Sequence, residues 1–160
     1  MALDTFARIG DIEGESLDAK HSGEIDVLSW SWGVMQTGTL AHGGGGGAGK
    51  ASFQDFTFTH HIDKASPLLM KSCATGIHIK DATITVRKAG KGQQEYLVIE
   101  LTDVLVTSVM PSLESEQGAT HEGVTLQSVK VDLEYKPQKP DGSLDVGIHF
   151  KYDGKANKVA

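Results

Sequence analysis

The order of apolar and polar residues predicts a chain built mainly of β-strands. Short segments alternate between apolar and polar side chains, and turns rich in glycine or polar residues separate them. Strands are expected over residues 5–12, 24–36, 77–88, 96–110, 122–135 and 146–152, with a further strand marked by Phe53, Phe56 and Phe58 and ending near His60. The tail after Asp153 is expected to be frayed. Many strands with one helix favour an antiparallel barrel or sandwich.

Both tryptophans lie in one of these strands. Trp30 and Trp32 are two residues apart, so simple alternation places both indoles on one face with Leu28 and Val34. Burial of two indoles needs a thick core, so this face is expected to be internal. The opposite face would carry small, mostly hydroxylic residues, namely Val27, Ser29, Ser31 and Gly33. We expect that face to meet water, a partner or a lumen.

Residues 96–110 are apolar on both faces of the expected strand. Leu97, Ile99, Leu101 and Leu105 fall on one side, and the other side carries Val98, Val104 and Val106. A barrel buries only its inner face, so these three valines need a second cover. The helix can supply part of it, and a neighbouring subunit is the simplest source of the rest, which makes Val98, Val104 and Val106 candidate interface residues.

Two local features indicate where the chain turns. In 122–135 the apolar positions change from even to odd numbers near Gln127, which predicts a β-bulge or a bend at a barrel corner. One helix is expected over about Asp63–Thr75. Asp63 or Ser66 can cap its start, Pro67 suits its first turn, and Gly76 suits the residue that ends it.

Composition and charge narrow the classes of function. The 160 residues suit a single domain, 1–160, with a sizeable core. A formal net charge of −6 disfavours nucleic acid and anionic membranes as partners. No apolar segment is long enough for a membrane span. Asp4 and Arg8 interrupt the start of the chain, which argues against a signal peptide and for synthesis in the cytoplasm. The single cysteine, Cys73, is expected to be a small core residue.

Candidate chemistry is weak. Residues 44–51 match a phosphate-binding loop through Lys50, but Ala51 stands where Ser or Thr should bind Mg²⁺, and a strand pattern follows instead of a helix. Seven histidines lack the spacing of a metal site, and the adjacent His60 and His61 would point to opposite strand faces. We therefore expect no enzyme activity, no cofactor and no metal.

A set of segments kept in order along essentially the whole chain carries a resemblance. They are Gly14-Glu15-Ser16 with His21, Glu24 to Gly33, the glycine run Gly43 to Gly49 with Lys50, Phe58-Thr59, Ile62 to Met70, Val86 to Gly90, and Tyr135 to Lys139. In these segments the chain resembles the Hcp family, the haemolysin-coregulated proteins of the bacterial type VI secretion system.

The resemblance implies a closed antiparallel β-barrel of two packed sheets with one flanking α-helix. It implies hexameric rings that stack into an inner tube inside a contractile sheath. A spike protein of the VgrG kind would sit at the tip, and the tube would leave the cell without a signal peptide. Effector proteins would be carried or chaperoned in the lumen. The family core has no catalytic activity.

Within this frame, Ser29, Ser31 and Gly33 are candidate lumen residues, and the alternative is that they pack under the helix. The loop Thr37 to Ser52 is the candidate for ring stacking, because its glycines allow reshaping on contact. Its candidate residues are Thr37, Gly38, His42, Gly43, Gly44, Gly45, Gly46, Gly47 and Lys50. Two other classes of function stay open: a monomeric β-barrel binding module that uses the glycine-rich loop, and a nucleotide hydrolase built on that loop.

Overall fold

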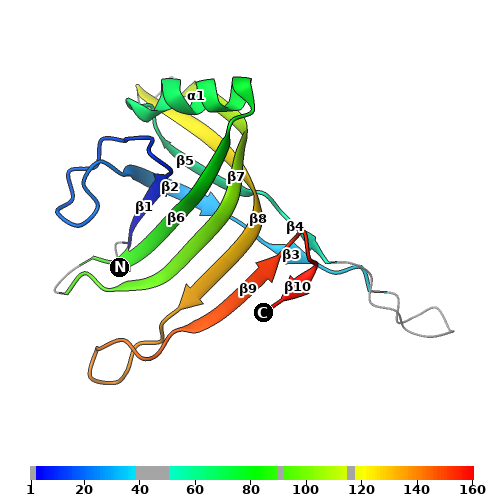
Figure 1. Ribbon diagram of the computed structural model, residues 1–160. Helices are drawn as coiled ribbons and strands as arrows, with labels where there is room; N and C mark the ends of the chain where they lie inside the picture. Colours follow the sequence, from blue (N-terminus) through cyan, green and yellow to red (C-terminus); the bar gives the residue numbers. More distant parts are fainter. Residues whose placement is uncertain (1–2, 39–50, 90–91, 115–117) are drawn as a thin grey trace, which may run out of the picture.

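The chain folds into an antiparallel β-barrel with a helix across one end (Figure 1). The computed structural model describes residues 3–38, 51–89, 92–114 and 118–160. The elements in this part are β1 (Leu3–Ile9), β2 (Ile25–Ser31), β3 (Val34–Met35), β4 (Ser52–Phe53), β5 (Phe56–His61), α1 (Ala65–Thr75), β6 (His78–Lys88), β7 (Glu95–Glu114), β8 (Ala119–Tyr135), β9 (Ile148–Asp153) and β10 (Lys158–Val159).

Six strands close the barrel. They follow the order β8–β5–β2–β1–β6–β7, and β7 pairs again with β8. One edge of β8 pairs with β7 along its length, while the other edge pairs first with β5 and then with β9. The predicted closed barrel with one helix is therefore confirmed. The expected frayed tail is wrong, because β10 pairs with β9 and extends the sheet beyond the barrel. The expected phenylalanine strand is divided into β4 and β5 at Gln54 and Asp55.

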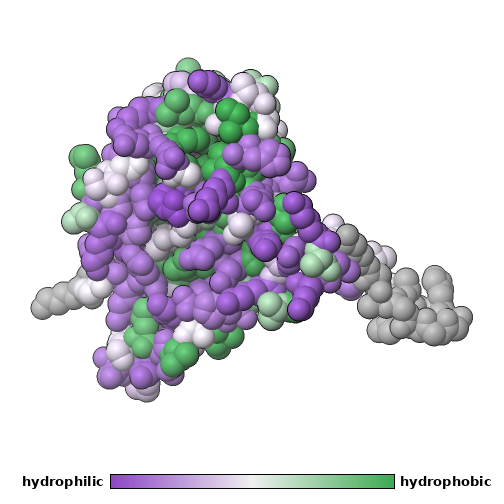
Figure 2. All heavy atoms as spheres, viewed as in Figure 1, coloured by the Kyte–Doolittle hydropathy of each residue, from purple (hydrophilic) through white to green (hydrophobic). Residues whose placement is uncertain are grey.

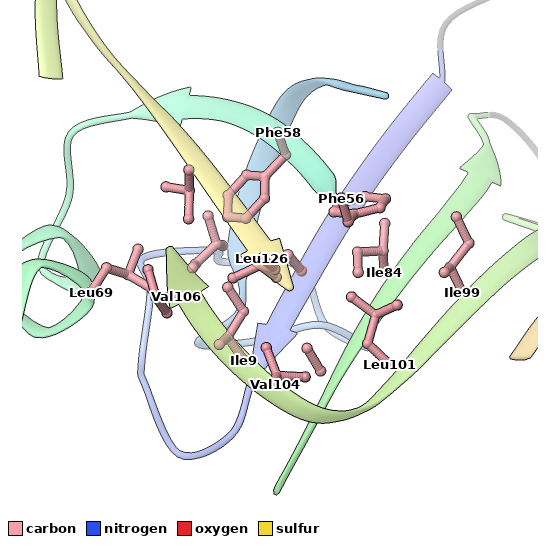
Figure 3. Close-up of a cluster of buried hydrophobic side chains, with 14 of the residues drawn as sticks. Ile9, Phe56, Phe58, Leu69, Ile84, Ile99, Leu101, Val104, Val106 and Leu126 are labelled. Carbon is pink, nitrogen blue, oxygen red and sulfur yellow. The ribbon is translucent and has the colours of Figure 1, made fainter. Parts of the chain in front are cut away.

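Apolar side chains from every strand of the barrel fill its interior. Ile9, Phe56, Phe58, Leu101 and Leu126 point toward one another and are almost fully buried (Figure 3). The helix lies across one end and buries Ala65 and Leu69 in this cluster. Burial of each large apolar side chain is worth about 1.5–3 kcal/mol, so this cluster is the main source of stability.

The long strands β7 and β8 both change the face that they turn inward. In β7, Leu101 and Val104 are both buried, and Asp103 between them has the left-handed φ of 55°. In β8 the buried positions change from even to odd numbers between Leu126 and Val131, which confirms the change of parity predicted near Gln127. The pairing register is unbroken from Thr102 to Val106, so both strands bend together there. It shifts just beyond, between Val106 and Ser108, where Thr107 is an extra residue of β7.

This bend overturns part of the interface prediction. Val104 and Val106 are 0% and 1% exposed and belong to the core, because Asp103 brings even-numbered residues to the inside. Val98 lies before the bend, pairs with the outward-facing Thr85, and is half-buried. The apolar pattern on both faces thus reflects the bend, and it gives no reason to place a subunit contact at Val104 or Val106.

A second irregularity lies in β2. The register against β5 shifts between Val27 and Ser29, so Leu28 is the extra residue of a bulge and is 51% exposed. Val27 consequently packs against the core, and Trp30 packs there too, with its ring 5.8 Å from that of Phe56. The prediction that Leu28 shares the face of Trp30 and that Val27 opposes it is wrong. Simple alternation failed at the bulge.

Trp32 lies beyond the end of β2 and belongs to a second aromatic cluster. Its ring is 5.9 Å from that of Phe53 and 6.5 Å from that of Phe150, and Phe53 stacks on Tyr152 at 4.1 Å. These contacts join the two-stranded ribbon β3–β4 to β9. Because β3 and β4 flank residues 39–50 along the chain, the cluster fixes the course of the chain just before and just after these residues.

The helix begins and ends much as expected. Asp63 Oδ1 accepts a hydrogen bond from the Ala65 N–H at 2.8 Å, and Ser66 Oγ accepts one from the Asp63 N–H at 3.1 Å. Both predicted capping residues therefore take part, although the helix itself starts at Ala65 after Lys64. Gly76 ends it with φ 64°, a conformation that glycine adopts without strain.

The bulge in β2 predicts unequal effects of two truncations. Trp30→Ala should lower the free energy of unfolding by about 3 kcal/mol, since it removes a large side chain that packs on the core. Leu28→Ala should lower it by less than about 1 kcal/mol, because the side chain is half exposed. Chemical denaturation of both variants checks this. Similar losses for the two would show that β2 alternates without a bulge.

Candidate functional site

The outer face of β2, β5 and β8 carries a row of small hydroxylic side chains. We call it the hydroxyl wall, and it consists of Ser29, Ser31, Thr57, Thr59 and Thr125. Strand register places Ser29 opposite Thr59, Ser31 opposite Thr57, and Thr57 opposite Thr125. Their neighbours along the strands, among them the buried Phe58, point into the core, so alternation turns all five outward.

Hydroxyl groups in the wall bond to one another across the strands. Ser29 Oγ lies 2.6 Å from Thr59 Oγ1, and Thr57 Oγ1 lies 3.4 Å from Thr125 Oγ1. Such pairs stabilise the sheet and still leave oxygen lone pairs free for water or a ligand. The wall carries no formal charge, so it can contact a polypeptide through hydrogen bonds without selecting its charge.

Two of the three predicted lumen residues lie in the wall. Ser29 and Ser31 are exposed on the outer face of the barrel, whereas α1 lies across its end, so the alternative that they pack under the helix is wrong. Gly33 is not in the row. It lies past the end of β2, and its carbonyl oxygen accepts a hydrogen bond from the Gln54 N–H at 2.9 Å.

The threonines of the wall were missed by the sequence analysis. The sequence Phe56-Thr57-Phe58-Thr59 alternates perfectly between aromatic and hydroxylic residues, and this signal could have revealed their outward direction. Their position beside Ser29 and Ser31 depends on pairing between distant strands, which the local sequence does not encode.

The face formed by β6 to β9 is different in character. It is mostly hydrophilic (Figure 2) and carries ion pairs, such as Lys130 with Asp153 at 3.7 Å and Lys151 with Asp132 at 3.9 Å. His149 Nδ1 lies 2.8 Å from Asp132, and this hydrogen bond raises the pKa of the imidazole. The uncharged wall and this charged face therefore divide the outer surface of the barrel.

Exposed apolar side chains gather at the two ends of the β7–β8 pair. Met110 and Leu113 are 68% and 65% exposed at the end of the pair where β7 ends and β8 begins. Tyr135, Val146 and Ile148 are exposed at the opposite end, around the connection from β8 to β9. Apolar patches of this kind on a soluble domain often mark contacts with other proteins.

Two ionic clusters stabilise the framework that presents these surfaces. The first fixes the segment 10–24 on the outside of β1 and β6. The buried Arg87 guanidinium donates to Asp18 Oδ1 at 3.0 Å and stands 4.8 Å from the Phe6 ring. This hydrogen bond holds the pKa of the Asp18 carboxyl well below its usual range.

The second cluster lies inside the barrel, at the end covered by the helix. His60 Nε2 is 2.9 Å from Glu122 Oε1, and both residues are 0% exposed. His60 Nδ1 is 3.8 Å from Asp63 Oδ2, and burial raises the pKa of the Asp63 carboxyl. The adjacent His61 is exposed on the outer face, so the two histidines point to opposite sides as expected.

The structure also places the predicted cysteine and the residues on either side of the glycine-rich segment. Cys73 is half-buried and packs against the core. The glycine-rich residues 43–49, with His42 and Lys50, lie outside the described residues, whereas Thr37 and Gly38 are exposed next to them. Ser52, expected at the end of this loop, belongs to β4. Among the described residues, no helix has both the length and the apolar character to cross a lipid bilayer.

Comparison with known proteins gives the class to which this chain belongs. The model of the family described as "Type VI secretion system effector, Hcp" matches residues 6–135, and the chain is a member of the Hcp family of type VI secretion proteins. This membership confirms the resemblance seen in the sequence. The family is a secretion-system family and not a known enzyme family.

Individual relatives agree with this assignment. The chain is 50% identical to protein hcp1 of Pseudomonas aeruginosa over 148 residues, which cover 92% of this chain and 91% of the relative. It superposes on the crystal structure of Hcp1 from Salmonella typhimurium with a TM-score of 0.80 and 39% identity, covering 99% and 100% of the two chains. A type VI secretion system effector from Yersinia pestis gives a TM-score of 0.77 at 39% identity, covering 94% and 99%.

The buried pair predicts a strong dependence of stability on both partners. His60→Leu should lower the free energy of unfolding by about 3–5 kcal/mol, because Glu122 stays buried without its partner. The double variant His60→Leu/Glu122→Leu should recover most of the loss, since it leaves no buried charge. Denaturant titration of the two variants measures this, with the exposed His61→Ala as the matched control. A single variant as stable as the double one would contradict the pairing.

Proposed function

We propose that this protein forms hexameric rings that stack into the inner tube of a type VI secretion machine. Membership of the Hcp family supports the secretion role. The ring and the tube are what the resemblance noted in the sequence implies. The observation that carries the proposal is the division of the outer surface. The hydroxyl wall is uncharged, and the face of β6 to β9 is charged. This division suits a tube whose inner surface accepts proteins of different charge and whose outer surface is hydrated.

The lateral contact of the ring uses different patches on neighbouring copies. A closed ring requires head-to-tail contacts, in which one surface of a subunit meets another surface of the next. The exposed apolar residues Met110 and Leu113 lie at one end of the β7–β8 pair, and Tyr135 and Ile148 lie at the other end. Because the two patches are far apart on one chain, they suit contact between successive copies.

The hydroxyl wall lines the lumen in this arrangement. Ser29 and Ser31 are exposed, and the pairing of β2 with β5 and β8 places three threonines beside them. Small uncharged side chains leave the bore wide and hydrated. Effector proteins of different charge could then be accommodated by hydrogen bonds and by water. This contact would allow the tube to carry or chaperone them.

Stacking of rings uses the glycine-rich segment. The ribbon β3–β4 leads into and out of residues 39–50, and the aromatic cluster of Trp32, Phe53 and Phe150 directs the ribbon. Thr37, Gly38, His42, the glycines 43–47 and Lys50 are the proposed contact residues. A VgrG-like spike at the tip and a surrounding contractile sheath are the proposed partners, and secretion without a signal peptide is the proposed route.

Ring formation gives the first functional prediction. Purified protein should have the mass of a hexamer in size-exclusion chromatography with light scattering, and negative-stain images should show annular particles. Protein that has the mass of one chain at every concentration, with no annular particles, would instead support a monomeric binding module.

The wall gives the second prediction. Ser31→Gln adds a longer side chain to the lumen, so it should leave the ring intact and reduce the amount of effector that co-purifies with it. Thr102→Gln is the matched control, because Thr102 is a small exposed hydroxylic residue of β7 near the charged residues Glu100 and Lys130. Quantitative mass spectrometry of bound effector measures both. Equal effector levels in the two variants would contradict the proposal that the hydroxyl wall lines the lumen.

A further inference from the structure

Two histidines form a cross-strand pair at the end of the hydroxyl wall. His61 of β5 and His121 of β8 are direct partners in the antiparallel register. The next residues along these strands, His60 and Glu122, are fully buried in the barrel, so alternation turns both imidazoles outward. The ring centres are 5.1 Å apart, with 43° between the ring planes.

This separation lies in the range over which two imidazoles can bind the same metal ion. When two imidazoles bind one ion through bonds of about 2.0–2.1 Å at angles of about 90–110°, as in tetragonal copper(II) or tetrahedral zinc(II) sites, their ring centres stand about 4.5–5 Å apart. His61 Nδ1 lies 3.4 Å from the Thr120 carbonyl oxygen. If Nδ1 carries the proton, it faces that carbonyl, and the lone pair of Nε2 is then available to a ligand. A carbonyl that orients an imidazole in this way is the usual second partner of a metal-binding histidine.

The two rings also lie next to a buried, hydrogen-bonded side-chain pair of the same two strands. Both neighbours on the inner side belong to the buried His60–Glu122 pair, whose atoms are 2.9 Å apart. The buried pair therefore fixes the backbone of β5 and β8 on one side of the histidine pair. On the other side the Ile62 N–H donates to the Thr120 carbonyl oxygen at 3.3 Å. Preorganised ligands on strands bind a metal more tightly than ligands on a loop, because less freedom is lost on binding.

We propose that His61 and His121 bind a divalent transition metal ion, with copper(II) preferred to zinc(II). Imidazole suits both ions, and affinity in a site of nitrogen ligands rises to a maximum at copper. Within the described residues, no group of three or more His, Cys, Asp and Glu side chains is placed to hold a metal. The pair thus supplies two ligands, and water supplies the rest. Both ligands come from one chain, so the site does not depend on ring formation.

Calorimetric titration of the purified protein with copper(II) chloride and with zinc(II) chloride tests the proposal. Wild-type protein should bind one ion per chain at this site, and copper(II) more tightly. His61→Gln and His121→Gln should each weaken binding by at least about 10–100-fold, the loss seen when even an outer partner of a ligand is removed. His78→Gln is the matched control, because His78 is an exposed histidine on a different strand, and it should bind as the wild type does.

A second measurement identifies the ligands directly. The electron paramagnetic resonance spectrum of the copper complex should show coupling to two imidazole nitrogens in the wild type and to one in each single variant. Circular dichroism confirms that the variants are folded. Unchanged binding in the double variant His61→Gln/His121→Gln, a loss of binding in His78→Gln, or a wild-type spectrum with one nitrogen would each overturn the proposal.

Discussion

Closure of the barrel depends on one long strand pair, β7 with β8. These strands pair along their whole length, and β8 then divides its other edge between β5 and β9. A pair this long cannot stay flat and still enclose a core, because paired strands twist and must tilt to close a barrel. The bend at Asp103 meets this constraint. It turns Leu101 and Val104 inward on either side of a single left-handed residue.

The bend decides which surfaces are left for other molecules. Since it brings Val104 and Val106 into the core, these two side chains are covered within one chain and need no neighbouring subunit. The surface that remains divides into the uncharged hydroxyl wall, the charged face of β6 to β9, and apolar patches at the two ends of β7–β8. In the proposed ring, each of these surfaces has a separate role. The exposed apolar patches at the two ends of β7–β8 would form the contacts between subunits, and the hydroxyl wall would stay free of such contacts.

Much of this could be predicted from the sequence wherever a local signal was present. Pro67 and Gly76 marked the helix, and the change of parity near Gln127 marked the corner in β8. The matching bend in β7 was missed because aspartate tolerates a left-handed backbone without requiring it, so Asp103 carries no distinctive signal. The bulge at Leu28 was missed for a similar reason. It is defined by pairing with β5 and not by composition, as is the row of threonines that completes the wall.

The central claim is that the face carrying Ser31 lines the bore of a ring. Electron microscopy of Ser31→Cys in a Cys73→Ser background, labelled at the new thiol with a small gold cluster, measures this directly. The predicted result is density inside the central hole, while the same label at Thr102→Cys stays out of it. Gold on the outer rim of the Ser31→Cys particles, or particles without a hole, would contradict the claim.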